Sequence, residues 1–283
     1  MNIKAKLEKY FYIPYYSFKQ GYVYLTNNIL GMISSVIFIS IVYYMWVAIY
    51  SSSGNLNYLE LNETITYVVI ITIINQIISR NTEMELGNKV ISGKIAVDLI
   101  KPIGFFSYMF FNRIGVIILN FVFSIIPLIL TSIFIFKINM ITDILKLLLF
   151  LLSIILSFFI VYLFEFLIGL TSFFTTQIFG MSLLKSSLVN ICAGLTIPLG
   201  FYPDILQKIL LNLPFQAMYY IPVSIYLDLP YKLNMIQNFL LNIGLHNKTL
   251  NVIIEQAFWI VLIAMITFIC WNTAKKKLVI QGG

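Results

Sequence analysis

The sequence predicts an all-α polytopic membrane protein with six transmembrane helices, and its composition and the spacing of its charges indicate this class. Of the 283 residues, 60% are hydrophobic and only 10% are charged, whereas a soluble domain carries about 25% charged residues. So few charges cannot cover a water-soluble surface, and most of the Ile, Leu and Phe side chains are expected to face lipid. The net charge of +7 is spread over loops and ends, which is typical of membrane topology rather than of nucleic-acid binding.

Charged residues separate six apolar runs, each close to the 20 residues that a helix needs to cross a bilayer. The predicted spans are residues 25–50, 61–79, 113–136, 144–174, 182–200 and 252–272. A Ser-Ser-Ser-Gly loop at 51–54 separates the first two.

A seventh uncharged run, 209–227, is interrupted by Pro214 and Pro222. If it crossed the membrane, the lysines at 275–277 would be external, against the positive-inside rule. With six spans, 13 Lys and Arg residues lie inside and 5 lie outside, so both termini are predicted to be cytoplasmic. Residues 203–226 are therefore predicted to form a re-entrant or interfacial pair of short helices, within an external segment at 200–250. The prolines assigned to this re-entrant segment are Pro198, Pro203, Pro214 and Pro222.

The N-terminal segment, residues 1–24, mixes lysines with six aromatic side chains between Tyr10 and Phe18. Such a mixture suits the headgroup layer, so we expect an amphipathic helix on the inner leaflet, with a frayed tail as the alternative. No cleavable signal peptide is expected, because this segment is basic, aromatic and broken by Pro14. The remaining residues, 25–283, are assigned to the transmembrane domain.

The one long cytoplasmic loop, residues 80–106, is predicted to hold two short helices. The first begins at Asn81 or Thr82, where Thr82 and Glu85 fit a capping box, and ends near Ser92, with Gly93 as its C-terminal cap. The second covers 95–100 and ends at Lys101, because Pro102 cannot continue a helix. This compact loop could transmit force from a soluble partner.

The loop also contains a near-match to a phosphate-binding motif, G-N-K-V-I-S-G-K-I at 87–95. The motif requires four residues between its glycines and a Ser or Thr after the lysine. Here there are five residues, and Ile95 replaces the hydroxyl. We therefore expect no ATP binding by this chain.

Several segments resemble the I-x-x-G-x-L…L-x-K-P signature and later motifs of ABC-2 type permeases, the membrane subunits of ATP-binding-cassette exporters. The resemblance is carried by residues 91–95, Leu99, Lys101, Pro102, 105–106, 168–170, Phe174, 195–199, 201–203, 206–209, 213–215 and 219–226. Each piece alone is common, but their order and spacing are specific, and together they extend over most of the chain.

The resemblance implies an N-terminal interfacial helix, six spans, a re-entrant pair after the fifth span and a coupling helix in the first cytoplasmic loop. It also implies a separate ATPase partner, which would hold the ATP and magnesium, and a second permease that is identical or different. The implied ATPase-coupling residues are Thr82, Glu85, Ile91, Ser92, Gly93, Lys94, Leu99, Lys101 and Pro102.

Polar residues within the predicted spans are candidates for a translocation path. Glu165 is a carboxylate inside the fourth span, where burying a charge is costly; it could be a gate, a cation site or the partner of Arg113 on the adjacent span. The other polar groups could equally bond across helices. The path candidates are Thr66, Asn75, Gln76, Glu165, Asn190 and Thr196.

No catalytic or metal site is predicted. His246 is the single histidine, and Cys192 and Cys270 lie in apolar runs, so a metal cluster or catalytic constellation has too few members. The predicted function is export of a hydrophobic or amphipathic substrate across a bacterial cell membrane. The alternative, an ion-coupled secondary transporter or channel, would require inverted repeats and several intramembrane ionisable groups.

Overall fold

The computed structural model describes residues 3–23, 25–53, 58–78, 81–136, 138, 140–175, 177–229 and 234–277. Within these ranges the chain is helical and contains no strand. Five helical stretches are long and apolar enough to cross a membrane, and the helix 179–192 is apolar but shorter. The all-α polytopic class is therefore confirmed.

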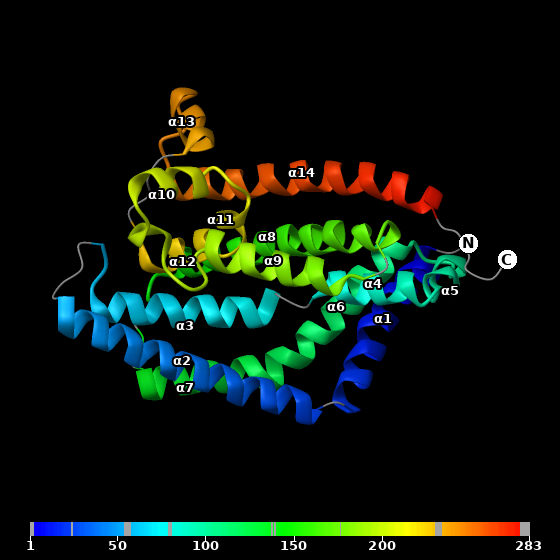
Figure 1. Cartoon of the computed structure of the whole chain (residues 1–283), viewed down its shortest axis with the longest axis horizontal. Coiled ribbons are helices and arrows are strands. Elements are labelled where there is room, and N and C mark those ends of the chain that lie inside the picture. The colour runs from blue at the N-terminus through cyan, green and yellow to red at the C-terminus, as the bar shows by residue number, and fades with distance from the viewer. Residues whose placement is uncertain are drawn as a thin grey trace.

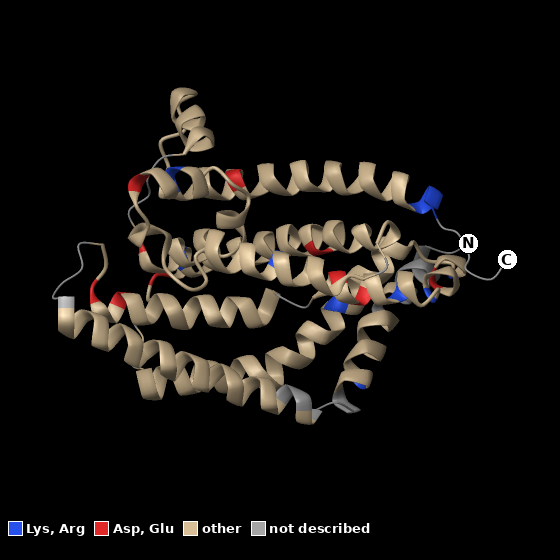
Figure 2. Cartoon of the chain, viewed as in Figure 1, with Lys and Arg blue, Asp and Glu red and all other residues tan. Residues whose placement is uncertain are grey.

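The long helices form one bundle, in which α3, α8 and α14 run along the long axis of the molecule and α2 and α6 run obliquely to it (Figure 1). They are α2 (Leu25–Ser53), α3 (Leu61–Ile78), α6 (Phe105–Asn120) with its continuation, α8 (Ile144–Gly169) and α14 (Lys248–Ala274). The start of α1 (Ile3–Val23) and the end of α14 lie at the same end of the bundle as α4 (Thr82–Ile91) and α5 (Ile95–Ile100). Charged residues gather toward the two ends of the bundle and are sparse along its middle (Figure 2).

Several span boundaries differ from those predicted. The third span begins at Phe105, two turns before Arg113, and continues through a π-helical segment, η1 (Phe121–Ile125), into α7 (Ile126–Phe136). The prediction used Arg113 as a charged boundary, but this side chain is buried inside the protein. Residues 51–53 belong to α2 rather than to a loop. Predicted features at Tyr24, Gly54, Ser79, Arg80, Lys137 and Lys232 lie outside the described residues.

The fifth span was predicted to reach Gly200, but α9 (Phe179–Cys192) ends after 14 residues. At 1.5 Å per residue this helix is about 21 Å long, shorter than the hydrocarbon core of about 30 Å. The chain leaves the helical axis at Gly194, whose φ of 78° is left-handed and favours glycine. A short 3₁₀ turn, η3 (Leu199–Phe201), follows.

The external segment contains more helices than the predicted pair. They are α10 (Asp204–Leu210), α11 (Phe215–Met218), α12 (Tyr220–Leu227) and α13 (Met235–Asn242). Pro203 and Pro214 each directly precede a helix, and Pro222 lies in the first turn of α12, where proline loses no helical hydrogen bond. The predicted pair of short helices at 203–226 is therefore wrong in number, because three helices, α10, α11 and α12, begin in this range and α13 follows it. Re-entry of this segment into the bilayer stays a prediction.

The N-terminal segment forms the single helix α1 rather than a frayed tail, and it packs against α6. A side chain at Gly115 of α6 would collide with the backbone of Pro14, so the glycine permits close contact between the two helices. Ser17 also donates a hydrogen bond to Oδ1 of Asn112, at 2.5 Å. The location of α1 on the inner leaflet stays a prediction.

Candidate functional site

The loop between the second and third spans forms two short helices joined by a tight turn. Helix α4 ends at Ile91, and Gly93 adopts a left-handed φ of 73° before α5 begins at Ile95. Helix α5 ends at Ile100, and Lys101 after it is extended, as expected before Pro102. The helices therefore have the lengths and the order expected from the sequence.

An ion-pair latch holds α5 against α4 and α6. Asp98 on α5 pairs with Lys89 of α4 at 3.0 Å and with Lys101 at 2.6 Å. Both ammonium groups also lie over the ring of Tyr108 on α6, an arrangement favoured by the negative face of the ring. Burial alone would raise the pKa of Asp98, but the two lysines outweigh it and hold the pKa below its usual value.

The predicted capping box at the start of α4 is wrong. Asn81 adopts a left-handed φ of 53° and its side chain forms no capping hydrogen bond. The backbone N–H of Thr82 instead donates to Oε2 of Glu165, 3.1 Å away on α8. Glu85 points toward Lys89 and Asn112. A carboxylate from a distant helix thus takes the role that the sequence pattern assigned to a local one, and its charge suits the helix N-terminus.

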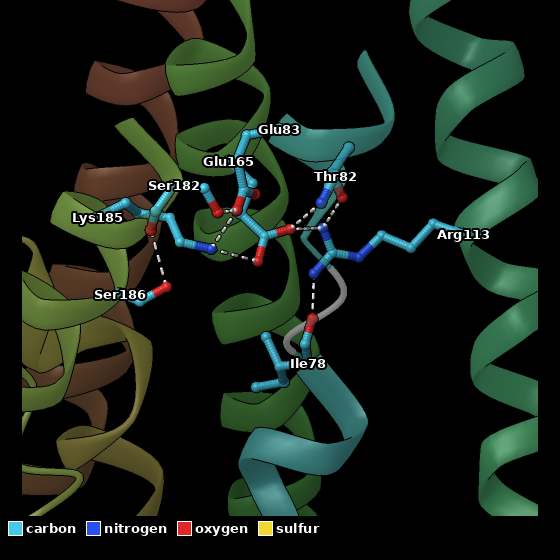
Figure 3. A network of polar contacts seen from close by, with 8 residues as sticks. All are labelled: Ile78, Thr82, Glu83, Arg113, Glu165, Ser182, Lys185 and Ser186. Carbon is cyan, nitrogen blue, oxygen red and sulfur yellow. Dashed lines mark hydrogen bonds and ion pairs between the residues drawn. The ribbon is translucent and has the colours of Figure 1, made fainter. Parts of the chain in front are cut away.

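Glu165 is the centre of a buried charge cluster, and its predicted pairing with Arg113 of α6 is present (Figure 3). Nη1 of Arg113 lies 2.7 Å from Oε2 of Glu165 and 2.7 Å from Oγ1 of Thr82. Nη2 of Arg113 donates to the carbonyl of Ile78, at the end of α3. The side chains of Arg113 and Glu165 are only 3% and 1% exposed.

A second ion pair completes the cluster. Nζ of Lys185, on α9, lies 2.8 Å from Oε1 of Glu83 on α4 and 3.5 Å from Oε1 of Glu165. Ser182 donates to the same oxygen of Glu83 at 2.6 Å. Two carboxylates thus face two cations, which is the arrangement that makes buried charges tolerable. The cluster joins α4 directly to α6, α8 and α9.

Glu83 and Lys185 are site residues that the sequence pattern does not single out. Glu83 is one of two acids in the first loop helix, and Lys185 belongs to the 13 Lys and Arg residues predicted to be cytoplasmic. Without the buried Arg113 and Lys185, eleven of the 13 Lys and Arg residues predicted to be cytoplasmic remain, against five predicted to be external. The predicted orientation is therefore unchanged. The available signal was the position of Lys185 inside an apolar run, which demands a partner.

Three of the six path candidates line one small cavity between α3, α8 and α9. This cavity has a volume of about 140 Å³ and includes Asn75, Glu165 and Asn190, together with Lys185 and Ser186. Thr66 bonds within its own helix, to the carbonyl of Asn62. Gln76 donates to Ser35 of α2, and Thr196 is exposed in the turn after α9. The structure therefore groups half of the candidates and separates the others.

The coupling candidates divide into a buried base and an exposed tip. Thr82 is buried in the charge cluster, and Glu85 and Lys101 are half-buried in the contacts around the latch. The remaining six are exposed: Ile91, Ser92, Gly93, Lys94, Leu99 and Pro102. Two further apolar side chains project from the tip, Val97 at 65% and Ile100 at 83% exposure.

A second buried carboxylate, Glu255, lies near the start of α14 among three amide side chains, and no sequence pattern indicates this arrangement. Oε1 of Glu255 accepts hydrogen bonds from Gln216 at 2.5 Å and Asn234 at 2.6 Å. Oε2 accepts one from Gln237 at 2.9 Å. The residue is fully buried, so these amides fasten α11 and α13 to α14. Within the described residues no group of three or more His, Cys, Asp or Glu side chains could hold a metal ion.

Comparison with known proteins identifies one family. A sequence model described as "ABC-2 family transporter protein" matches residues 35–282, which include all the spanning helices except the first turns of α2. No curated protein matches the chain.

Proposed function

The chain belongs to the ABC-2 family of transporter proteins, and we propose that it is the permease subunit of an exporter powered by a separate ATPase. Members of this family are membrane transport components. In this proposal the ATPase holds the ATP and magnesium, and this chain converts its motion into movement of the spanning helices.

The observation that carries the proposal is the contrast between the tip and the base of the cytoplasmic loop. At the tip, Val97, Leu99 and Ile100 are exposed, although apolar groups gain free energy when a partner covers them. At the base, Thr82 and Glu83 are bonded to α6, α8 and α9, two of which are long enough to span the membrane. A partner that moves the tip would therefore move the bundle.

The transport path is proposed to run along the cavity between α3, α8 and α9, at an interface with a second permease. Exposed apolar side chains on α2 and α9 offer surfaces for lipid, for that permease or for an apolar substrate. The proposed cargo is a hydrophobic or amphipathic molecule, such as a peptide antibiotic, a drug or a lipid-like compound, moved outward across a bacterial cell membrane. Both termini are proposed to be cytoplasmic.

An ion-coupled carrier has less support. Such a carrier needs ionisable groups that bind and release an ion, whereas Glu165 is paired with Arg113 and lies close to Lys185. Its charge is already neutralised by the protein.

Purification of the tagged chain from its native membrane tests the proposal. We expect an ATPase with a phosphate-binding loop to co-purify, and the reconstituted pair to export substrate in an ATP-dependent assay against a panel of peptides, drugs and lipids. Purification of the chain alone, with ion-gradient-driven transport, would contradict it.

Substitution of Gly93 tests the coupling role of the loop. Valine cannot readily adopt the left-handed φ of 73° found at Gly93, so G93V should distort the turn between α4 and α5. We expect ATP-driven export to fall while the chain still reaches the membrane. Unchanged export by G93V, and by a bulky substitution of Pro102, would exclude the coupling role; I205A, on the exposed side of α10, is the control.

A further inference from the structure

Helices α4 and α9 meet along one face of each. The contacting side chains are Ser182 and Lys185 on α9 and Ile178 directly before it, and their spacing of i, i+4 and i+7 places them on one side of the helix. On α4 the contacting residues are Glu83 and Gly87, four residues apart. The two helices therefore share a continuous seam rather than a single contact.

The seam combines close packing with a buried ion pair. A Cβ atom at Gly87 would lie 2.7 Å from the side chain of Ile178, so only glycine lets the two helices approach this closely. One turn away, Oε1 of Glu83 accepts from Ser182 at 2.6 Å and faces Nζ of Lys185 at 2.8 Å. Both charged side chains are almost completely buried.

The opposite face of α9 is apolar and open. Its exposed side chains include Leu183, Leu184, Leu188 and Ile191. Lys185 lies closer to Glu83 of α4 than to Glu165 of α8, 2.8 Å against 3.5 Å. The shorter ion pair of Lys185 therefore joins α9 to α4.

We propose that the Glu83–Lys185 pair is the link through which α4 moves α9, so that α9 follows the cytoplasmic loop during the transport cycle. Glu83 and Lys185 are positioning residues in this role, which rests on the proposed function. A buried pair resists separation because each charge would be left without a partner. Since Ser186 and Asn190 on α9 line the polar cavity, movement of α9 would change its shape.

Thiol accessibility on α9 tests the link without knowledge of the substrate. The protein is purified with its ATPase, the native Cys192 and Cys270 are replaced by alanine, and L188C is introduced on the exposed face of α9. The rate of maleimide modification is then measured with and without ATP. We expect ATP to change this rate with Glu83 and Lys185 intact.

The informative variant is E83Q/K185M, which removes one negative and one positive charge together and so leaves no buried charge unpaired. We expect it to fold, to retain the ATPase and to hydrolyse ATP, but to lose the ATP-dependent change at L188C. The conservative variant K185R should keep the change. The control K146M/D228N removes the ion pair at the start of α8, whose carboxylate is largely exposed, and should also keep it.

An unaltered ATP response in E83Q/K185M, with the ATPase bound and active, would overturn the link while leaving the proposed function intact. Failure of any ATPase to co-purify would overturn the proposed function itself, and the link with it. A bound and active ATPase without any ATP response at L188C in the parent protein would show that α9 does not follow the loop.

Discussion

Two buried carboxylates, Glu165 in the last turns of α8 and Glu255 in the first turns of α14, are satisfied in opposite ways. Glu165 lies beside Arg113 and Lys185, within a cluster of balanced charges that connects four helices. Glu255 accepts three hydrogen bonds from the neutral amides of Gln216, Asn234 and Gln237. One carboxylate is thus held by charge pairs and the other by amide donors.

This difference determines how each cluster responds when the helices around it move. Charge pairs attract over several ångströms, so Lys185 can stay bound to one carboxylate while its distance to the other changes. Amide hydrogen bonds weaken steeply when their geometry is lost. We infer that the cluster around Glu165 tolerates relative movement of helices, whereas the hydrogen bonds at Glu255 hold α11 and α13 in a fixed position against α14.

The largest effect is expected for R113M. This change removes the cation nearest to Glu165 and the bonds to Thr82 and Ile78, and loss of one partner of a buried pair costs about 3–5 kcal/mol. Thermal unfolding in detergent should show a clear loss of stability. Stability equal to that of the parent protein would mean that the cluster is not structural.

Matched glutamine substitutions at Glu165 and Glu255 compare how much each carboxylate contributes to stability. E165Q leaves two buried cations with one remaining carboxylate, at a cost of about 3–5 kcal/mol. E255Q leaves no charge unpaired and weakens hydrogen bonds from amides, at a cost of about 1–3 kcal/mol. Unfolding measurements on both variants should rank E165Q as the less stable, and the reverse order would contradict the assignment of the two clusters.

Asp98 is expected to give the latch between α4 and α5 an acid-sensitive component. Because its pKa is lowered in the folded protein, its contribution is present above the unfolded value of about 3.9 and is lost as the pH falls through the lower folded value. The protection factors of residues 95–100 in hydrogen exchange, which correct for the pH dependence of intrinsic exchange, should therefore be steady near neutral pH and fall only below about pH 4. D98N should lack this acid-dependent step; an identical step in D98N would assign it to another group.

The smallest effect is expected for K146M. Lys146 pairs with Asp228, whose side chain is 77% exposed, and exposed pairs contribute about 0–1 kcal/mol. The thermal unfolding of K146M in detergent should be nearly indistinguishable from that of the parent protein. A loss comparable to that of R113M would remove the distinction between buried and exposed pairs on which the ranking rests.

The sequence predicted the helical class and the layout of the cytoplasmic loop because these depend on local signals. Apolar runs of spanning length, Gly93 and Pro102 each act on their own neighbours. The Glu165–Arg113 pair could also be anticipated, since a carboxylate inside a span needs a partner.

The remaining features depend on tertiary contacts that local patterns do not encode. Thr82 and Glu85 satisfied the pattern of a capping box, but Glu165 from α8 reached the helix N-terminus instead. The sequence pattern of Lys185 is that of a charge near a membrane boundary, whereas the structure places it opposite Glu83. The end of α9 at Cys192 was hidden by the apolar residues that continue to Gly200.

Site-specific cross-linking at the tip of the loop formed by α4 and α5 is the decisive test of an ATPase docking there. A photo-reactive amino acid at Ile100, which is 83% exposed, should capture an ATPase with a phosphate-binding loop in native membranes, whereas the same group at Ile205, 79% exposed on α10, should not. Capture of the ATPase at Ile100 alone is the predicted result. Capture of no ATPase at Ile100, or of the same ATPase equally at both positions, would contradict the account.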